Sequence, residues 1–300
     1  MFTGMPEGGA RPAGGPVQLS AGERARSALA GSRFADVRWT ASTGSTNADA
    51  MDLARDGARE GTVVVADHQT AGRGRRSRTW VAPPGGSLLV SVLLRPPARV
   101  AGAVGFAAGL AMAEAVEEVA GVVARLKWPN DLVVDTPDGE RKLSGLLAEA
   151  DWPAGSHAAA GYRVPRPDER LAVVVGIGVN VDWPRPGADG VDPELEALAD
   201  TATALSWLGA AVDRVDLLVA YLRRLERRYG ALVAEGPADL LDDWRARSAT
   251  LGRRVRVDLG ADDVEGTAAD VTAEGHLVVD TLEGGRRTLA VGDVVHLRPL

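Results

Sequence analysis

The stretch of the sequence best suited to chemistry is a loop rich in arginine and glycine, GRGRRSR at residues 72–78. Gly72 and Gly74 let the backbone approach a ligand closely and expose its N–H groups. The arginines supply charge-assisted donors that fit a phosphate or a carboxylate. The loop lacks the third glycine of the dinucleotide-binding fingerprint and the Gly-Lys-Ser/Thr ending of a P-loop. Taken alone, it is explained either by an anion site or by a polar surface hairpin.

Lysine is almost absent from a chain that carries 34 Lys and Arg residues, since only Lys127 and Lys142 occur. Lysine presents a compact ammonium charge, whereas arginine presents a planar fork. Lys127 stands at the end of a predicted strand in KWPND, where Pro, Asn and Asp predict a turn. We therefore expect Lys127 to face an anionic reacting group. Lys142 is explained equally well by function and by chance.

Three further features have ordinary structural explanations beside functional ones. Ser45 is expected to cap a helix, and hydroxyl and amide groups at a helix N-terminus also bind polar ligand ends. The glycines of GIGVN, residues 176–180, resemble half of a nucleotide-binding turn but are explained equally by close packing in a strand. Trp80 could line a ligand pocket, although buried tryptophans are more often core. The four histidines lack ligand spacing, so no dedicated metal site is expected.

Composition narrows the class of protein. The chain has 300 residues, 45% hydrophobic content, no cysteine and a net charge of −7. Disulfides and thiolate metal sites are therefore excluded, and a reducing compartment is compatible. The acidic balance disfavours binding of nucleic acid through a basic face. The longest apolar run, about 100–113, is too short to span a bilayer, and the N-terminus does not read as a signal peptide.

Hydrophobic patterning predicts an α+β fold in two parts. A leader with a short helix occupies 1–32, a mixed domain 33–247, and a small β-barrel of five short strands 250–300. Residues 151–169 are rich in Pro and Gly and are expected to form an exposed insertion. Strands are expected at 37–43, 61–69, 86–96, 124–129 and 171–181, with a hairpin between 131 and 150. Helices are expected at 20–31, 45–57, 101–119, 213–234 and 237–247.

The order of the short motifs is more specific than any one of them. STN, QTAGRGRRSRTW, KWPND, KLSGLLAE and GIGVN follow one another and precede the small barrel. This set resembles the biotin protein ligases over residues 33–300. The resemblance implies a class II synthetase-like catalytic domain with a C-terminal SH3-like barrel. It also implies that biotin and MgATP form biotinyl-5′-AMP, from which biotin passes to a lysine of a biotin carboxyl carrier domain.

The resemblance further implies roles for residues of the matching motifs. Lys127 and Arg73 would be catalytic, with Lys127 contacting the biotin carboxylate and the α-phosphate. The expected biotin-binding residues are Ser45, Thr46, Asn47, Gln69, Gly72, Arg73, Gly74, Arg75, Lys127, Gly145 and Leu147. The expected ATP-binding residues are Arg75, Arg76, Trp80, Lys127, Asn130, Asn180 and Arg298. One departure concerns Ser77, which stands where the family loop commonly has glycine and should reduce the freedom of the loop.

The resemblance is compatible with a homodimer and implies a cytoplasmic enzyme. From the acidic charge and the short apolar runs, neither DNA nor a membrane is expected as a partner. No helix-turn-helix is visible, so the repressor role of two-function members is not carried over. The alternatives are a lipoate or octanoate ligase of the same fold and a non-catalytic biotin or nucleotide sensor. The arginine loop and terminal barrel argue against a lipoate ligase, and a sensor would bind without releasing pyrophosphate.

Overall fold

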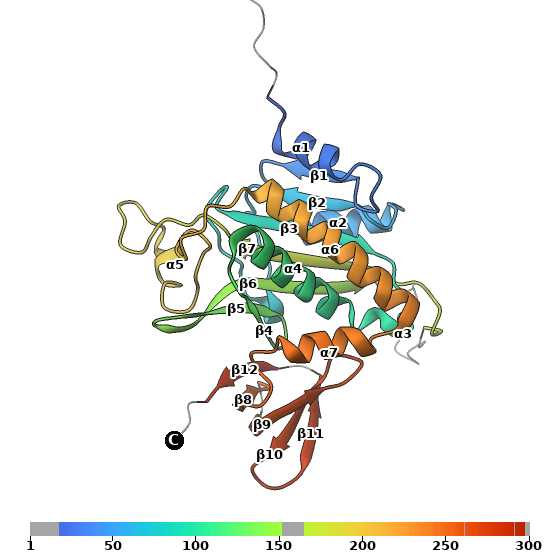
Figure 1. Ribbon diagram of the computed structural model, residues 1–300, viewed down its shortest axis with the longest axis vertical. Helices are drawn as coiled ribbons and strands as arrows, with labels where there is room; N and C mark the ends of the chain where they lie inside the picture. The colour runs from blue at the N-terminus through green and yellow to red at the C-terminus, as the bar shows by residue number, and fades with distance from the viewer. Residues whose placement is uncertain (1–17, 152–164, 261, 291, 298–300) are drawn as a thin grey trace, which may run out of the picture.

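The computed structural model describes residues 18–151, 165–260, 262–290 and 292–297, which form two β-sheets (Figure 1). The larger sheet is mixed and has the strand order β1-β2-β3-β7-β6-β5-β4. Only β1 and β2 pair in parallel; the other neighbours are antiparallel. Its strands are β1 (Val37–Thr40), β2 (Val63–Ala66), β3 (Ser87–Leu94), β4 (Arg125–Lys127), β5 (Asp131–Thr136), β6 (Gly139–Asp151) and β7 (Ala172–Asn180).

Helices cover both faces of this sheet. Helices α4 (Val104–Ala120) and α6 (Arg214–Glu235) lie side by side over one face, visible in green and orange in Figure 1. Helix α2 (Thr46–Arg55) packs against β2, β3 and β7 on the other face. The strands β2, β3 and β7 are nearly all buried because both of their faces are covered. The shorter helices are α1 (Ala21–Ala28), α3 (Ala98–Ala101), α5 (Pro193–Glu196) and α7 (Ala238–Ala246).

The C-terminal part is a five-stranded antiparallel sheet of order β11-β10-β9-β8-β12. Alternate residues of β8 and β9 are buried, which is the period-2 pattern of strands with one face on a core. The sheet fits the expected SH3-like barrel in its five short antiparallel strands. Its strands are β8 (Arg254–Asp258), β9 (Asp263–Val271), β10 (Leu277–Thr281), β11 (Arg286–Leu289) and β12 (Asp293–His296).

The segment that enters the C-terminal sheet is itself bonded to the larger sheet. Leu126 of edge strand β4 pairs with Ser248 as an isolated parallel bridge. The backbone N–H of Trp128 donates to the Thr250 hydroxyl at 3.0 Å, and its indole N–H donates to the Gly275 carbonyl at 2.9 Å. Trp128 is only 2% exposed, so it is a core residue that joins the two sheets.

Several expectations from the sequence need correction or fall outside the described residues. The helix expected at 101–119 is confirmed as α4, and the short helix α3 that precedes it was not expected. Helix α5 was not expected at all. Residues 1–17 of the expected leader and 152–164 of the expected insertion lie outside the described residues. Within the part of the chain that the structure describes, every helix is too short or too polar to traverse a bilayer.

Candidate functional site

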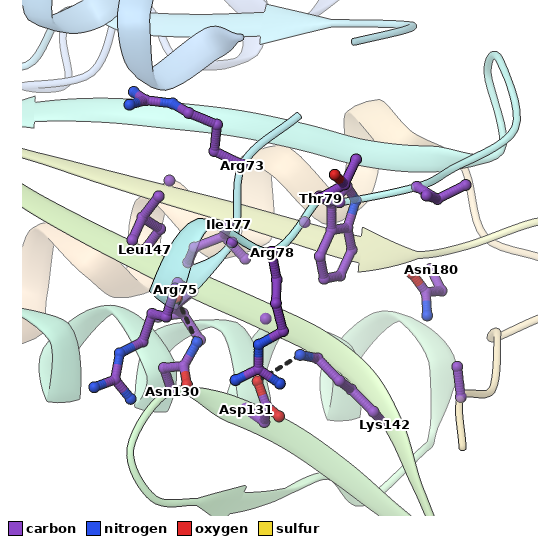
Figure 2. A pocket seen from close by; sticks show the side chains of 18 of the residues that line it. Arg73, Arg75, Arg78, Thr79, Asn130, Asp131, Lys142, Leu147, Ile177 and Asn180 are labelled. Atoms are coloured by element: carbon purple, nitrogen blue, oxygen red, sulfur yellow. Dashed lines mark hydrogen bonds and ion pairs between the residues drawn. The ribbon is translucent and has the colours of Figure 1, made fainter. Parts of the chain in front are cut away.

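A cavity of about 610 Å³ opens on the face of the larger sheet that carries α2. Its floor comes from β6 and β7, and its rim comes from the arginine loop, the end of β4 and the C-terminal sheet (Figure 2). The structure brings most of the expected site residues to this one place. Those lining the cavity are Ser45, Thr46, Asn47, Gln69, Arg73, Gly74, Arg75, Trp80, Lys127, Asn130, Gly145, Leu147 and Asn180.

Three expected residues are not among those lining the cavity. Gly72 and Arg76 line a neighbouring hollow that the arginine loop forms with Leu147, Glu149 and Gly292. Arg76 points to the C-terminal sheet, where its guanidinium lies 3.3 Å from the Asp293 carboxylate. Arg298 lies outside the described residues.

One end of the cavity is built from neutral polar groups at the start of α2. The Gln69 side-chain oxygen accepts from the Thr46 backbone N–H at 2.7 Å and lies 2.9 Å from the Thr46 hydroxyl. The Ser91 hydroxyl lies 2.8 Å from Thr46 Oγ1 and 2.6 Å from Asn47 Oδ1. Ser45 occupies the N-cap position, but its side chain makes no capping bond. Ser45 is therefore the N-cap residue that was expected, but Gln69 of another segment, and not the Ser45 side chain, satisfies the helix N-terminus.

The glycines of GIGVN make room for two side chains on the cavity floor. A Cβ at Gly176 would lie 2.0 Å from Asn47 Oδ1, and a Cβ at Gly178 would lie 2.5 Å from the Trp80 indole. A Cβ at Gly145 would also meet Trp80, at 2.9 Å. The explanation by close packing in a strand is therefore correct, and the packed side chains themselves line the cavity.

The arginine loop sends its side chains in two directions. Arg75 and Arg78 extend to one side, toward Asn130 and Asp131, whereas Arg73 points the opposite way (Figure 2). Arg73 pairs with the Glu149 carboxylate at 3.0 Å. Burial lowers the pKa of Arg75, although a guanidinium stays charged at any ordinary pH. Arg78 also pairs with the Asp293 carboxylate at 2.7 Å, so the loop offers Arg75 as its cation for an anion in the cavity.

Ser77 adopts the left-handed backbone conformation, with φ of 60°, in the short 3-10 turn η1 (Arg75–Ser77). That region favours glycine over other residues by about 1–2 kcal/mol. We therefore predict that Ser77→Gly stabilises the protein by roughly 0.5 kcal/mol, since the gain is offset by greater freedom of the unfolded chain. Thermal unfolding would measure this, with Ser77→Ala as the control that keeps the strain. Equal midpoints for the two variants would contradict the prediction.

Both lysines of the chain line the cavity. Lys127 donates to Glu140 Oε1 at 3.1 Å. Lys142 pairs with the Asp131 carboxylate at 2.7 Å and lies 5.6 Å from the centre of a Trp80 ring. The sequence had left Lys142 undecided, and its rarity was the signal that could have placed it in the site.

Glu140 is the carboxylate that faces Lys127. Burial alone would raise the pKa of Glu140, but the hydrogen bond and charge of His296 and the charge of Lys127 outweigh it and lower the pKa to about 2. Because this pKa is below the ordinary value of 4.5, the ionised carboxylate stabilises the fold above about pH 4.5. That contribution is lost as the pH falls toward 2.

We predict that this loss can be seen by comparing the protein with its Glu140→Gln variant. The wild-type advantage in unfolding free energy should shrink by roughly 2–3 kcal/mol between pH 5 and pH 2. It should stay constant between pH 5 and pH 6. Denaturant unfolding at a series of pH values measures the unfolding free energy of both proteins. If the two curves against pH are parallel throughout, the lowered pKa of Glu140 is refuted.

The segment between β7 and α6 also lines the cavity, which the sequence did not suggest. Leu198, Thr201 and Ala202 reach the cavity from this segment. It is held by its own small core, in which Trp183 and Ala202 are buried. Asn180 fastens it to the sheet, since its amide donates to the Thr203 carbonyl at 2.9 Å. Its mixed Gly, Pro and acidic composition carries no periodic signal that could have predicted this contact.

Two buried polar atoms at the cavity have neither a hydrogen-bond partner nor an ion-pair partner among the described residues. They are Trp80 Nε1, a donor, and Asn180 Oδ1, an acceptor. Buried polar atoms are nearly always paired in folded proteins, so such atoms beside a cavity are available to a ligand. The cavity therefore combines a neutral polar end with a cationic end, and it offers a donor and an acceptor between them.

Two family models match the chain. Residues 39–159 match the Biotin/lipoate A/B protein ligase family, and residues 250–297 match the Biotin protein ligase C terminal domain. The Biotin--[acetyl-CoA-carboxylase] ligase of Mycobacterium tuberculosis is 38% identical over 278 residues, which cover 90% of this chain and 92% of that protein. The ligase of the same name from Paracoccus denitrificans is 33% identical, with 85% and 98% of the two chains covered.

The solved structures include similar folds. The biotin protein ligase from Aquifex aeolicus, in complex with biotin and ATP, superposes with a TM-score of 0.67 and 26% identity. The match covers 89% of this chain and all of that one. Both the catalytic-type fold and the C-terminal sheet are thus shared in sequence and structure. The chain belongs to the biotin protein ligase family.

Proposed function

We propose that the protein is an ATP-dependent biotin ligase. In the first step, a carboxylate oxygen of biotin attacks the α-phosphorus of ATP, the bond to the bridging oxygen breaks, and pyrophosphate leaves. The product is biotinyl-5′-AMP. In the second step, a lysine amine of a carrier domain attacks the acyl carbon, AMP leaves, and the amine loses a proton. This activity is supported by relatives that are named biotin ligases and that this chain matches along nearly their whole length.

The observation that carries the proposal is the division of one cavity into a neutral end and a cationic end. The ureido head of biotin is neutral and rich in donors and acceptors, which fits the group formed by Thr46, Asn47 and Gln69. The biotin carboxylate and the triphosphate are both anionic and repel each other. Bringing them together requires fixed cations in a confined site, which Lys127 and Arg75 supply.

Individual roles follow from this orientation. We assign Ser45, Thr46, Asn47 and Gln69 to the biotin head and Gly145 and Leu147 to the wall of its pocket. Lys127 is assigned to the carboxylate and the α-phosphate, and Gly72, Arg73, Gly74 and Arg75 to the loop that covers the adenylate. The nucleotide is assigned to Arg75, Arg76, Trp80, Lys127, Asn130, Asn180 and Arg298.

The chemistry needs no nucleophile from the protein, because the carboxylate of biotin and the amine of the carrier are the two nucleophiles. An acyl-adenylate is prone to hydrolysis, so a loop that closes over it is useful. Mg²⁺ is expected to arrive with the triphosphate. The carrier domain, the cytoplasmic location, the domain limits 33–247 and 250–300, a homodimer and the lack of DNA binding remain predictions from the sequence.

Pyrophosphate release that depends on both biotin and ATP tests the proposal. A purified biotin carboxyl carrier domain should then gain the mass of one biotinyl group. Lipoate and octanoate serve as competing acids in the same assay. Release with lipoate but not with biotin would identify a lipoate ligase, and binding of biotin without release would identify a sensor.

A further inference from the structure

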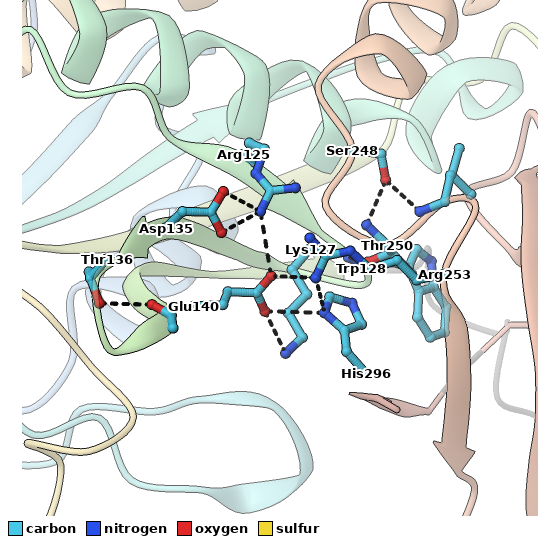
Figure 3. Close-up of polar contacts among 12 residues, drawn as sticks. Arg125, Lys127, Trp128, Asp135, Thr136, Glu140, Ser248, Thr250, Arg253 and His296 are labelled. Carbon is cyan, nitrogen blue, oxygen red and sulfur yellow. Dashed lines mark hydrogen bonds and ion pairs between the residues drawn. The ribbon is translucent and has the colours of Figure 1, made fainter. Parts of the chain in front are cut away.

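Glu140 lies where the larger sheet meets the C-terminal sheet, and cations of both contact it (Figure 3). Its Oε1 is 3.1 Å from the ammonium of Lys127 and 3.2 Å from His296 Nδ1. Its Oε2 is 3.3 Å from the guanidinium of Arg253. Lys127 belongs to β4, whereas Arg253 and His296 belong to the C-terminal part of the chain. The Glu140 side chain is only 16% exposed, so these contacts are shielded from solvent.

The backbone around Lys127 is held from the same direction. Leu126 donates its N–H to the Arg247 carbonyl at 2.9 Å, and Ala249 N–H donates to the Leu126 carbonyl at 2.7 Å. These bonds tie the free edge of β4 to the segment that enters the C-terminal sheet. Residues 247–249 therefore hold the strand of Lys127, and Glu140, which Arg253 and His296 contact, holds its side chain.

We propose that Glu140 is a positioning residue for Lys127, through which Arg253 and His296 of the C-terminal part set the efficiency of biotin activation. The inference rests on the proposed function. Glu140 does not line the cavity, so its effect must pass through the lysine ammonium. A lysine has a long flexible stem, and a fixed carboxylate removes rotamer freedom before the substrates arrive.

The charges around Glu140 decide whether the Lys127 ammonium can still attract an anionic substrate. An isolated Lys-Glu pair would present no net charge to an anionic substrate. Here Arg253 shares the same carboxylate, while Arg125 is already paired with Asp135 at 2.6 Å. The group Lys127, Glu140 and Arg253 therefore keeps one net positive charge beside the cavity. Removing Arg253 would leave this group with no net charge. Removing Glu140 would leave the Lys127 ammonium without a fixed position.

Steady-state pyrophosphate release by the full-length protein tests this inference. Glu140→Gln should lower kcat about 20-fold while KM for biotin changes less than about twofold, because the substrate-binding residues are untouched. Glu140→Asp should recover at least about one third of the lost activity, since it restores the charge. Arg253→Met should lower kcat by roughly threefold to fivefold. Arg256→Met is the matched control, since Arg256 pairs with Asp263 within the C-terminal sheet, and it should leave kcat unchanged.

The double variant Glu140→Gln/Arg253→Met separates positioning from general loss of stability. If Arg253 acts through Glu140, the kcat of the double variant should lie within about twofold of the kcat of Glu140→Gln alone. Fully multiplied losses would overturn the inference, as would a wild-type kcat in Glu140→Gln. If Glu140→Gln does not fold, the inference is tested by comparing the kcat of Arg253→Met with that of Arg256→Met. Equal values for these two variants would refute it. An inactive wild-type protein would instead refute the proposed function.

Discussion

Replacing Lys127 with alanine is expected to lower kcat for biotin-dependent pyrophosphate release about 1,000-fold, a loss typical of a removed preorganised charge. Lys127 is the cation at the end of β4, on the rim of the cavity. Such a cation stabilises the charge that develops at the α-phosphate and offsets the repulsion between the two anionic substrates. Lys127→Arg should not restore the rate, because a planar guanidinium cannot take the place of a compact ammonium.

The fold should survive this change. Glu140 keeps Arg253 at 3.3 Å and His296 at 3.2 Å when the lysine is absent, so its carboxylate is not left unpaired. Lys142→Ala is the matched control from the same cavity, and we expect a loss of only about tenfold. The charge of Lys142 is offset by Asp131, whereas Lys127, Glu140 and Arg253 together keep a positive charge. Pre-steady-state release of pyrophosphate measures the chemical step. A Lys127→Ala rate within tenfold of wild type would remove Lys127 from the mechanism.

Local patterns were enough to predict the framework of the fold. The strands at 63–66, 87–94 and 172–180 are continuous apolar runs because both of their faces are covered. The turn of the hairpin between β5 and β6 lies at residues 137–138, where Pro and Asp favour a turn. The five short C-terminal strands were likewise visible as alternating segments between Gly and Asp turns.

The parts of the site that the sequence could not predict depend on contacts between distant segments. Gln69 caps α2 although it is 23 residues away from Thr46. Glu140 reads as an ordinary residue beside a hairpin turn, and its partners Arg253 and His296 follow more than 100 residues later. Leu198 and Ala202 reach the cavity from a segment with no periodic pattern. Tertiary contacts of this kind leave no signal in a local window of sequence.

The role of Gly176 in β7 also depends on a contact with a distant segment, so local sequence could not predict it. This glycine is the basis of the second prediction of a large effect. Gly176→Ala should lower kcat/KM for biotin about 30-fold and destabilise the fold by roughly 1–3 kcal/mol, as overpacking of a core does. The new Cβ would lie 2.0 Å from Asn47 Oδ1 and 2.8 Å from Asn47 Cγ. Asn47 cannot swing aside freely, because its amide donates to the Leu147 carbonyl and the Glu149 carboxylate. Its displacement would break both bonds and deform the neutral end of the cavity.

Two further variants show whether the effect passes through Asn47. Gly230→Ala is the matched control, since Gly230 lies in α6 with open space around it and should be neutral or slightly stabilising in a helix. In an Asn47→Ala background the clashing atoms are gone, so adding Gly176→Ala should cost less than about twofold in kcat/KM. Initial rates at several biotin concentrations and thermal unfolding give all the values needed. If Gly176→Ala lowers kcat/KM equally with and without Asn47, then the glycine is needed for the strand itself and not to make space for Asn47.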